Sequence, residues 1–526
     1  MATKLTNGLN QEYYIDFSGG SNSFIGVRQI ADNESPSNCN CDFMGKGGIG
    51  NRSGYLQLDA PGTHASGVAG MGELQTASLN QLLAFKSNGA NVTMSYSANG
   101  SAWNEVTGTT FVNKNIDGVE AAGNFYIGNG TDTMQHWDGA NWNVTTNGTL
   151  GYIPAYYNNR IWIIDEVYPD RLNFSGQYSE QVVGGSGTAP TSKLGDFSDA
   201  SSGWVSFKFG SGAQITGLKV FKNALYVFLR DSIYSVVPAT SANTFTISLV
   251  TNAVGCVSNR SIAQVGEDLY FAADDGIYSL GDVANFVGVV RSTAISGKIQ
   301  QIFNNMTLTM KSKMVGAFFG FKYHLFYSTQ GVVNDSCMVF DTRYGGWLYW
   351  NNISASAALV YNNNLNTRTL VFGHPTTSSV YTMYTGVTDN GTTISSYWYS
   401  KSFDNGLPDR MKLFFDTTFV FGALNGVINV STIFDDSQTG AGASIVQLRP
   451  QGGLGRDRLG QKVLGGGTNA LTVTNYSAEP LRLKAKNKKF AIQYMVSSSG
   501  FWRLDSIGQT YEIFDHFKFP GNLKLN

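Results

Sequence analysis

Short runs of apolar and aromatic residues, bounded by Gly, Asn, Asp and Ser, recur along most of this chain of 526 residues. Representative runs are Leu225–Leu229, Leu269–Phe271 and Thr369–Phe372, and each is followed by a turn and a second apolar run. Such runs between turn-forming residues are typical of β-strands, whereas the 3.6-residue period of amphipathic helices is nearly absent. The pattern therefore predicts an all-β protein built from successive hairpins.

The hairpins recur at roughly the spacing of β-propeller blades, which is ~40–50 residues for four strands. The first apolar run of each unit lies near Leu82, Phe125, Ile161, Leu225, Leu269, His324 and Leu370. The longest interval contains a Gly/Ser-rich insert over residues 176–203, which we expect to be an exposed loop. Seven units between residues 60 and 386 predict a β-propeller of six to eight blades, because a closed ring of sheets leaves few free strand edges.

Two further regions fall outside the predicted propeller. Residues 1–59 show little pattern beyond turns and are predicted to form an irregular N-terminal arm. Residues 387–526 are predicted to form a C-terminal β-sandwich-like domain, because their apolar runs are longer and alternate more cleanly. These runs are Met411–Phe421, Gly426–Phe434 and Lys489–Met495. The Gly-rich stretch 435–470 is too long for an ordinary connection, so it is expected to be an arm that meets a partner or a mobile loop.

The composition adds information about the surface of the protein, its net charge and its N-terminal residues. Hydrophobic residues make up 42% of the chain, which allows a large core, but charged residues make up only 14%, against a usual ~25%. A polar, weakly charged surface is common in chains that pack against copies of themselves. The formal net charge of −1 provides no global attraction to nucleic acid or to an anionic membrane. The polar residues 1–10 do not resemble a signal peptide, so we expect synthesis in the cytoplasm.

No motif in the sequence predicts catalysis, a cofactor or a metal. The chain has no P-loop, no HExxH and no GxSxG pattern, and its five histidines are scattered singly. The four cysteines, at positions 39, 41, 256 and 337, do not have the spacing of a zinc site and are predicted to be free. The acidic pair Asp274–Asp275 before Gly276 lacks the alternating oxygen ligands of a calcium loop and is predicted to make a turn. The sequence therefore favours a structural protein rather than an enzyme.

One short segment keeps an enzymatic alternative open. The segment Ser97–Trp103 resembles the Asp-box hairpin of sialidase-type propellers, although it has Asn99 before Gly100 and no Asp. A sialidase would also need three arginines that converge on a carboxylate. The candidate arginines are Arg160, Arg230, Arg260, Arg291 and Arg343, and no spacing selects three of them.

A basic run near the C-terminus is a candidate interface or phosphate contact. Its residues are Arg482, Lys484, Lys486, Lys488 and Lys489. On a strand, the alternating members of this run would place positive charge along one face. The charge could meet phosphates, but no aromatic residue is interleaved with it, which weakens the case for single-strand binding. A solvated strand face or a contact between subunits is the favoured interpretation.

The order of several short motifs resembles that of propeller proteins from tailed bacteriophages. The first motifs run from Asp16 to Gly20, from Asp32 to Pro36 and from Gly47 to Tyr55, and similar patterns follow at Tyr168–Leu172, at 255–280 and near the end of the chain. The residues that carry the resemblance are Phe17, Gly19, Gly20, Asn33, Arg52, Gly54, Tyr55, Pro169, Asp170 and Arg171. The likeness is strongest to the tail hub or nozzle proteins of short-tailed phages, which include the packaged-DNA-stabilisation proteins.

This resemblance implies a structural role in the virion tail. Such proteins form rings, usually homohexamers, below the portal and adaptor; their propellers enclose the DNA exit channel, and fibres or spikes dock outside. It implies that residues 1–59 and 387–526 contact neighbouring subunits, and that double-stranded DNA passes during ejection without sequence-specific binding or membrane insertion. Two alternatives stay open: a carbohydrate-binding or glycan-hydrolysing, sialidase-like propeller, and a baseplate or fibre adaptor of a long-tailed phage.

Overall fold

The computed structural model of the chain describes most of its residues. The described residues are 3–4, 9–58, 66–98, 102–108, 110–145, 147–178, 193–208, 213–240, 243–285, 294–363, 367–425, 428–436, 445–448 and 481–513. The chain divides into two compact units. One consists of residues Tyr55–Val339 and Asn351–Thr385, and the other of Met1–Gly54, Phe340–Trp350 and Gly386–Asn526.

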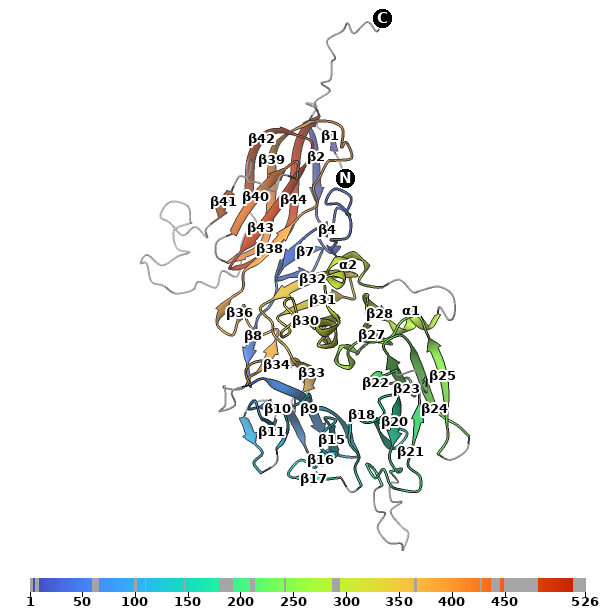
Figure 1. The fold of residues 1–526 in the computed structure, drawn as a ribbon. Helices are drawn as coiled ribbons and strands as arrows, with labels where there is room; N and C mark the ends of the chain where they lie inside the picture. The colour runs from blue at the N-terminus through green and yellow to red at the C-terminus, as the bar shows by residue number, and fades with distance from the viewer. Residues whose placement is uncertain are drawn as a thin grey trace, which may run out of the picture. The chain divides into compact units, whose positions relative to one another are not determined.

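The first unit is a β-propeller of seven blades, and its sheets surround a common centre in Figure 1. Blade 1 contains β9 (Val68–Gln75), β10 (Asn80–Ser87), β11 (Asn91–Ala98) and β12 (Ala102–Glu105), with β13 (Phe111–Val112) paired to β11. Blade 2 contains β14 (Asp117–Ala121), β15 (Asn124–Gly128), β16 (Gln135–Trp137) and β17 (Trp142–Val144). Blade 3 contains β18 (Gly151–Tyr157), β19 (Arg160–Asp165), β20 (Arg171–Phe174) and β21 (Gly203–Ser206). Blade 4 contains β22 (Ile215–Phe221), β23 (Ala224–Leu229), β24 (Ile233–Pro238) and β25 (Phe245–Thr251).

The remaining three blades are less regular. Blade 5 has β26 (Ala263–Val265), β27 (Asp268–Ala272) and β28 (Ile277–Ser279), preceded by η1 (Asn259–Ser261) and followed by α1 (Leu280–Asn285). Short helices η2 (Gly297–Ile299), α2 (Gln300–Asn304) and α3 (Leu308–Ser312) lead to blade 6, which contains β29 (Val315–Phe319), β30 (Lys322–Tyr327) and β31 (Ser336–Asp341). Blade 7 contains β33 (Ala357–Asn362), β34 (Arg368–Gly373), β35 (Val380–Met383) and β8 (Tyr55–Gln57).

The seven blades form a closed ring. The first strands of neighbouring blades contact one another from β9 to β14, β18 and β22, then through η1 to β26 and β29, and finally through β33 back to β9. Each of the seven positions that mark the units, from Leu82 to Leu370, lies on the second strand of a different blade. The predicted propeller is therefore confirmed, with seven blades.

The ends of the propeller meet in blade 7, which the sequence did not predict. Strand β8 is antiparallel to β35, with Tyr55 opposite Met383 and Gln57 opposite Tyr381. The predicted arm of residues 1–59 thus includes the closing strand of the ring. A strand of three residues has no local pattern that separates it from a turn, because its pairing energy comes from a partner more than 300 residues away.

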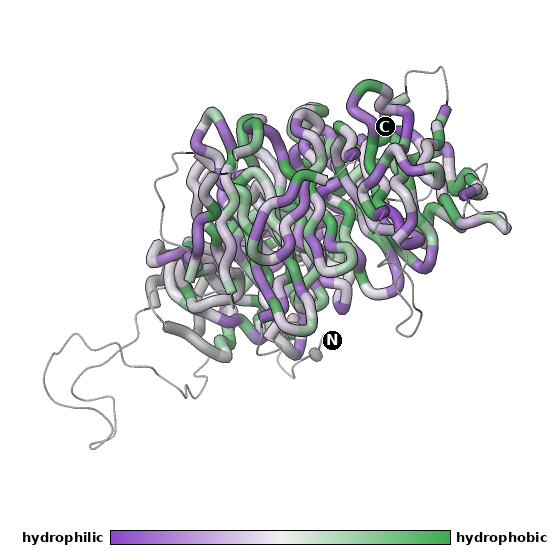
Figure 2. Tube along the Cα trace, turned by 90° about the horizontal axis from the view of Figure 1, so that it is seen from below, coloured by the Kyte–Doolittle hydropathy of each residue, from purple (hydrophilic) through white to green (hydrophobic). Residues whose placement is uncertain are grey.

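Apolar side chains fill the spaces between neighbouring blades. One cluster contains Trp162 and Phe174 of blade 3 and Leu225 and Val236 of blade 4, and another joins Phe228 of blade 4 to the core of blade 5. Hydrophobic and hydrophilic positions interleave along the chain in Figure 2. This interleaving follows from strand geometry, because successive side chains point to opposite faces of a sheet.

The second unit contains two β-sheets that face each other. One sheet has the order β1 (Thr3–Lys4), β2 (Asn10–Tyr14), β44 (Phe501–Ile513), β39 (Lys412–Asn425) and β42 (Leu481–Lys489), and β7 (Gly48–Asn51) pairs both β44 and β6 (Cys41–Met44). The other has the order β41 (Ile445–Leu448), β40 (Ile428–Phe434), β43 (Ile492–Ser498), β38 (Ser396–Tyr399) and β5 (Asn38–Cys39). Phe414 and Phe419 of the first sheet contact Phe434 and Tyr494 of the second. The unit is therefore a β-sandwich.

Shorter strands complete this unit, namely β3 (Gly20–Ser21), β4 (Glu34–Ser35), β32 (Gly346–Asn351), β36 (Thr388–Asp389) and β37 (Thr392–Thr393). The three long strands predicted between residues 411 and 495 are present as β39, β40 and β43, with ends shifted by at most four residues. Most of the Gly-rich stretch 435–470 lies outside the described residues, as do residues 179–192 of the insert in blade 3.

Residues 1–59 do not form a separate arm, which corrects the predicted domain boundaries. Residues Asn10–Tyr14 pair with Ile507–Tyr511 of β44, and Ile49 and Gly50 pair with Leu504 and Arg503. Asn38 and Cys39 pair with Trp398 and Tyr397 of β38. These segments cover strands that would otherwise expose unpaired backbone groups, so the N-terminal and C-terminal residues fold as one unit.

Candidate functional site: the central cavity of the propeller

A cavity of about 660 Å³ lies at the centre of the propeller. Every blade contributes to its wall through its first strand: Met71 of β9, Glu120 of β14, Tyr156 of β18, Lys219 of β22, Gln264 of β26, Phe318 of β29 and Leu359 of β33 are among the lining residues. This volume falls within the range of roughly 300–1,000 Å³ that is usual for small-molecule sites.

Arg260 of helix η1 reaches across one end of this cavity. Its Nε atom donates to the Asp117 carboxylate at 2.9 Å, and Nη1 donates to the Ser356 carbonyl oxygen at 2.9 Å. Its Nη2 atom donates to the carbonyl oxygens of Ala69 at 2.9 Å and Ile116 at 3.0 Å. These partners stand at the starts of β33, β9 and β14, so one guanidinium ties blade 5 to blades 7, 1 and 2.

Two other charged side chains line the cavity and are not neutralised in this way. The Lys219 side chain is half-buried, and burial lowers its pKa. Glu120 accepts a hydrogen bond from the Gln75 backbone N–H at 3.4 Å, and partial desolvation of its carboxyl by the cavity wall raises its pKa. The sequence did not single out either residue, because neither stands in a recognisable motif.

The arginines that a sialidase would require do not converge within the described part of the chain. Arg160 donates to the carbonyl oxygens of Ser175 and Ser201, whereas Arg230 pairs with Asp274. Arg343 pairs with Asp341 of its own turn. Arg260 lines the cavity, whereas Arg160, Arg230 and Arg343 do not. Arg291 lies outside the described residues.

The segment that resembles an Asp-box is part of a hairpin in blade 1. Ser97 pairs with Trp103, and Ala98 pairs with Ala102, across the turn between β11 and β12. The turn itself, residues 99–101, lies outside the described residues. The pairing accounts for the resemblance, because a tight hairpin is what the motif has in common with this segment.

Arg52 is one of the residues that carry the resemblance to phage propeller proteins. It forms a buried ion pair in the β-sandwich unit. Its Nη1 and Nη2 atoms donate to the two carboxylate oxygens of Asp389 at 2.8 and 2.6 Å. The side chains of Arg52 and Asp389 are only 0% and 5% exposed. Arg52 Nε also donates to Asn40 Oδ1 at 2.9 Å. The pair joins the N-terminal segment to the segment that begins at residue 386.

Two of the glycines in the resembling motifs stand where a side chain would clash. Gly20 has a φ of +72°, and a Cβ there would lie 2.5 Å from the backbone nitrogen of Trp347. A Cβ at Gly54 would lie 1.9 Å from the carbonyl oxygen of Thr388. Both positions therefore require glycine, because the neighbouring atoms belong to backbone.

The other resembling residues of the N-terminal segment also have structural roles. The ring of Phe17 packs edge-on against Trp398 at 5.0 Å. The Gly19 N–H donates to the carbonyl oxygen of Asn33 at 3.0 Å. Tyr55, which opens the propeller unit, packs against Phe372 and Tyr381 of blade 7.

The remaining resembling residues lie at the start of β20 in blade 3. The Arg171 guanidinium lies over the rings of Tyr168 at 4.0 Å and Trp204 at 4.4 Å. Asp170 accepts a hydrogen bond from the Ser206 hydroxyl at 2.7 Å, and the Pro169 carbonyl oxygen accepts one from the Ile215 N–H at 2.9 Å. This turn therefore links blade 3 to the first strand of blade 4.

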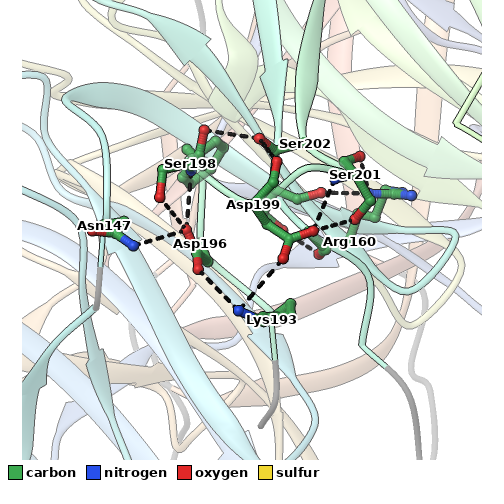
Figure 3. A network of polar contacts seen from close by, with 11 residues as sticks. Asn147, Arg160, Lys193, Asp196, Ser198, Asp199, Ser201 and Ser202 are labelled. Carbon is green, nitrogen blue, oxygen red and sulfur yellow. Dashed lines mark hydrogen bonds and ion pairs between the residues drawn. The ribbon is translucent and has the colours of Figure 1, made fainter.

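A polar network orders residues 193–202 beside blade 3 (Figure 3). Asp196 accepts hydrogen bonds from the N–H and hydroxyl of Ser198, and Asp199 accepts the same pair from Ser201. The Lys193 ammonium lies between the two carboxylates, 3.7 Å from Asp196 and 3.4 Å from Asp199. Hydrogen bonds hold the pKa of both carboxyls below the usual range. Asn147 donates to Asp196 at 3.2 Å, and Arg160 of β19 donates to the Ser201 carbonyl oxygen at 2.8 Å. We therefore assign this network a structural role, because it fastens residues 193–202 to blade 3 and to the segment that precedes it.

The basic run lies on strand β42, which pairs with β39. The side chains of Arg482, Lys484 and Lys486 lie outside the described residues. Lys489 lies 3.5 Å from the Asp435 carboxylate, and Lys488 is exposed. One charge of the run is thus partly neutralised within the unit.

All four cysteines are free and buried, as predicted. Within the described residues there is no group of three or more His, Cys, Asp or Glu side chains that could hold a metal ion. No helix in that part of the chain has the length and apolarity needed to span a membrane.

The chain matches no protein-family model and no curated protein. Solved structures similar to it include YCF48 bound to a D1 peptide, with 9% identity over 67% of this chain and 99% of that chain at a TM-score of 0.38. The AfRom2 CNH domain is 6% identical over 62% of this chain and 98% of its own, at a TM-score of 0.36. The WD40 domain of Neurospora crassa Pan2 is 7% identical over 64% and 95%, at a TM-score of 0.34. The strand pairing of the seven blades defines the fold.

Proposed function

We propose that this protein is a structural component of a phage virion tail, a hub or nozzle that assembles as a ring around the DNA exit channel. The observation that carries the proposal is the ordered set of motifs that resembles tailed-phage propeller proteins. These residues occupy positions with specific geometric demands, such as the glycine contacts at Gly20 and Gly54 and the buried pair of Arg52 with Asp389.

In this proposal the DNA channel lies between subunits and not along the axis of a propeller. The propeller cavity has a volume of only about 660 Å³ and is crossed by Arg260. A DNA duplex, whose major groove alone is about 12 Å wide, does not fit such a space. The ring of subunits would therefore provide the opening.

The charge of the chain is compatible with passage of DNA. A protein that neutralises many phosphates binds DNA tightly and in a salt-dependent manner. The formal net charge here is −1, and only 14% of the residues are charged. A channel lined by such a surface would let DNA slide through it. We propose portal, adaptor and fibre or spike proteins as the neighbours in the tail, with residues 1–59 and 387–526 as the contact regions.

The test is the mass of the full-length protein in solution, measured by light scattering over a range of concentrations, with negative-stain images of the same sample. We expect rings of about six copies with a central hole, formed alone or on a purified portal–adaptor complex. A protein that stays monomeric under both conditions would contradict the proposal. Specific binding to sialosides or other glycans in a parallel screen would favour the carbohydrate-processing alternative instead.

A further inference from the structure

Strand β25 forms the outer edge of blade 4 (Figure 1). Among the described residues it pairs only with β24. It has seven residues, whereas the outer strands β12, β17 and β21 of blades 1 to 3 have three or four. The outer side of an edge strand presents a row of unpaired N–H and C=O groups, which can pair with a strand of another chain.

The hydrogen bonds between β24 and β25 show which backbone groups point outward. The Ala239 N–H donates to the Thr244 carbonyl oxygen at 2.9 Å, so these two residues form a hydrogen-bonded pair next to the turn. Hydrogen-bonded and non-hydrogen-bonded pairs alternate along an antiparallel ladder. The register therefore places Ile247 and Leu249 in non-hydrogen-bonded pairs with β24. Their N–H and C=O groups point away from the blade.

The middle of β25 lacks the features that usually keep edge strands from pairing, which are charged side chains, proline and bulges. The strand contains no charged residue and no proline. Its one register shift lies at Val250, near the end of the strand. Residues 246–249 are all exposed, and the side chains of Ile247 and Leu249 are 40% and 49% exposed. A second strand can therefore reach this part of the edge.

The order of residues in β25 is complementary to itself about Ser248. When two copies of the strand lie antiparallel with Ser248 opposite Ser248, Ile247 of each copy faces Leu249 of the other. Thr246 then faces Val250. Apolar and β-branched cross-strand pairs of this kind stabilise a sheet, and no like charges meet. The outward backbone groups of Ile247 and Leu249 also face each other, so they can exchange hydrogen bonds.

We propose that β25 pairs antiparallel with β25 of a second copy of this chain, centred on Ser248, so that two propeller blades join into one continuous sheet. A strand of this length spans about 24 Å. The pair therefore covers much less than the ~800 Å² per partner that stable complexes bury, and the association is weak and depends on concentration. This inference is independent of the proposed ring, because it uses the rim of the propeller and not residues 1–59 and 387–526.

The test is disulfide crosslinking of the full-length protein with S248C. The two Ser248 residues would form a non-hydrogen-bonded pair with Cα atoms about 4.5 Å apart, which a disulfide can span. T246C is the matched control, because Thr246 is exposed on the same strand but would lie about 14 Å from its counterpart. The four native cysteines are buried. We expect roughly tenfold more covalent dimer from S248C on mild oxidation. Equal yields, or no dimer from S248C, would overturn the proposal and leave the edge to a strand of another protein.

A pair of charge variants tests the register without any crosslink. S248K and S248E each place two like charges opposite each other across the pair, which opposes association. A mixture of the two variants places opposite charges there. Sedimentation velocity at high concentration should show more association in the mixture than in either variant alone. Ring formation through other surfaces would be the same in all three samples, so it does not affect this difference. A mixture that behaves like the separate variants would contradict the pairing at Ser248.

Discussion

At the residue scale, Arg52 and Asp389 form an ion pair that is almost wholly excluded from water. Removal of one partner from such a pair leaves an unpaired buried charge, which typically costs about 3–5 kcal/mol. The Arg230–Asp274 pair has the same chemistry at the surface, where the side chains are 56% and 42% exposed. The two pairs therefore allow a matched comparison of burial.

We predict that Arg52→Met lowers the free energy of unfolding of the β-sandwich unit by about 3–5 kcal/mol. Arg230→Met should change the stability of the propeller by about 1 kcal/mol or less, because surface ion pairs contribute little. Thermal unfolding combined with limited proteolysis measures both effects. Similar small shifts in the two variants would show that Asp389 is accommodated without its partner.

His324 is a second residue whose environment decides its charge. It is buried on β30, and its Nε2 atom lies 2.6 Å from the Tyr384 hydroxyl oxygen. Burial, followed by the nearby Lys322 charge, lowers the pKa of His324 to about 3. The imidazole is therefore neutral in the folded protein at pH 7, whereas in the unfolded chain it titrates near its ordinary pKa of 6.5.

This difference makes the propeller less stable as the pH falls. Between pH 6.5 and 3 the unfolded chain binds a proton at this site that the folded protein does not, so each pH unit in this window costs up to about 1.4 kcal/mol. The contribution is fully present above pH 6.5. We predict that wild-type protein loses more stability between pH 7 and 5 than His324→Gln, measured by thermal unfolding of both proteins. Parallel pH profiles would contradict the assignment to His324.

At the element scale, the propeller depends on strands that come from distant parts of the chain. Blade 7 takes its fourth strand, β8, from the start of the unit, and Leu56 of this strand pairs with Thr382. The Leu56 side chain is 50% exposed. Its contribution therefore comes from the backbone rather than from packing.

We predict that Leu56→Pro destabilises the propeller by about 3 kcal/mol or more, because proline has no N–H to donate to the sheet. Leu56→Ala should be nearly neutral, since it keeps the backbone and removes an exposed side chain. Hydrogen exchange of blade 7, compared among the three proteins, gives the measurement. Equal protection in both variants would show that β8 does not close the ring through its backbone.

Arg260 acts at the same scale, because its four hydrogen bonds connect the starts of strands in blades 7, 1 and 2 to blade 5. It appeared in the sequence only as one of several arginines that a sialidase would need. Its partners are three backbone carbonyl oxygens and one carboxylate, all more than 90 residues away in the sequence. Local sequence patterns carry no information on such distant partners, so the hydrogen bonds of Arg260 could not be predicted from the sequence.

At the scale of the whole molecule, the β-sandwich unit is assembled from both ends of the chain. Strand β2 covers the edge of β44, and β7 pairs with the same strand. Without the N-terminal residues, β44 would present an unpaired edge, and Asp389 would lose Arg52. Exposed strand edges promote aggregation.

We predict that deletion of residues 1–54 makes the segment 396–513 sensitive to protease and lowers the yield of soluble protein. The full-length chain under the same conditions is the control. A truncated protein with an equally resistant C-terminal segment would show that the β-sandwich is stable without its N-terminal strands.

The sequence alone determined the strand content, the number of repeating units and the three long strands of the C-terminal domain. Each of these is encoded in the alternation and spacing of nearby side chains, because a strand with one buried face repeats every two residues. The seven positions from Leu82 to Leu370 are on seven separate blades for this reason.

Only the tertiary structure decided which segments pair across the chain. The closing strand β8, the pairing of residues 10–14 with β44, the partners of Arg52 and Arg260 and the exposure of Lys219 to the cavity all depend on residues far away in sequence. The free energy of these contacts appears only when the partner is in place. Sequence periodicity records which side of a strand is buried, but it does not record what lies against that side.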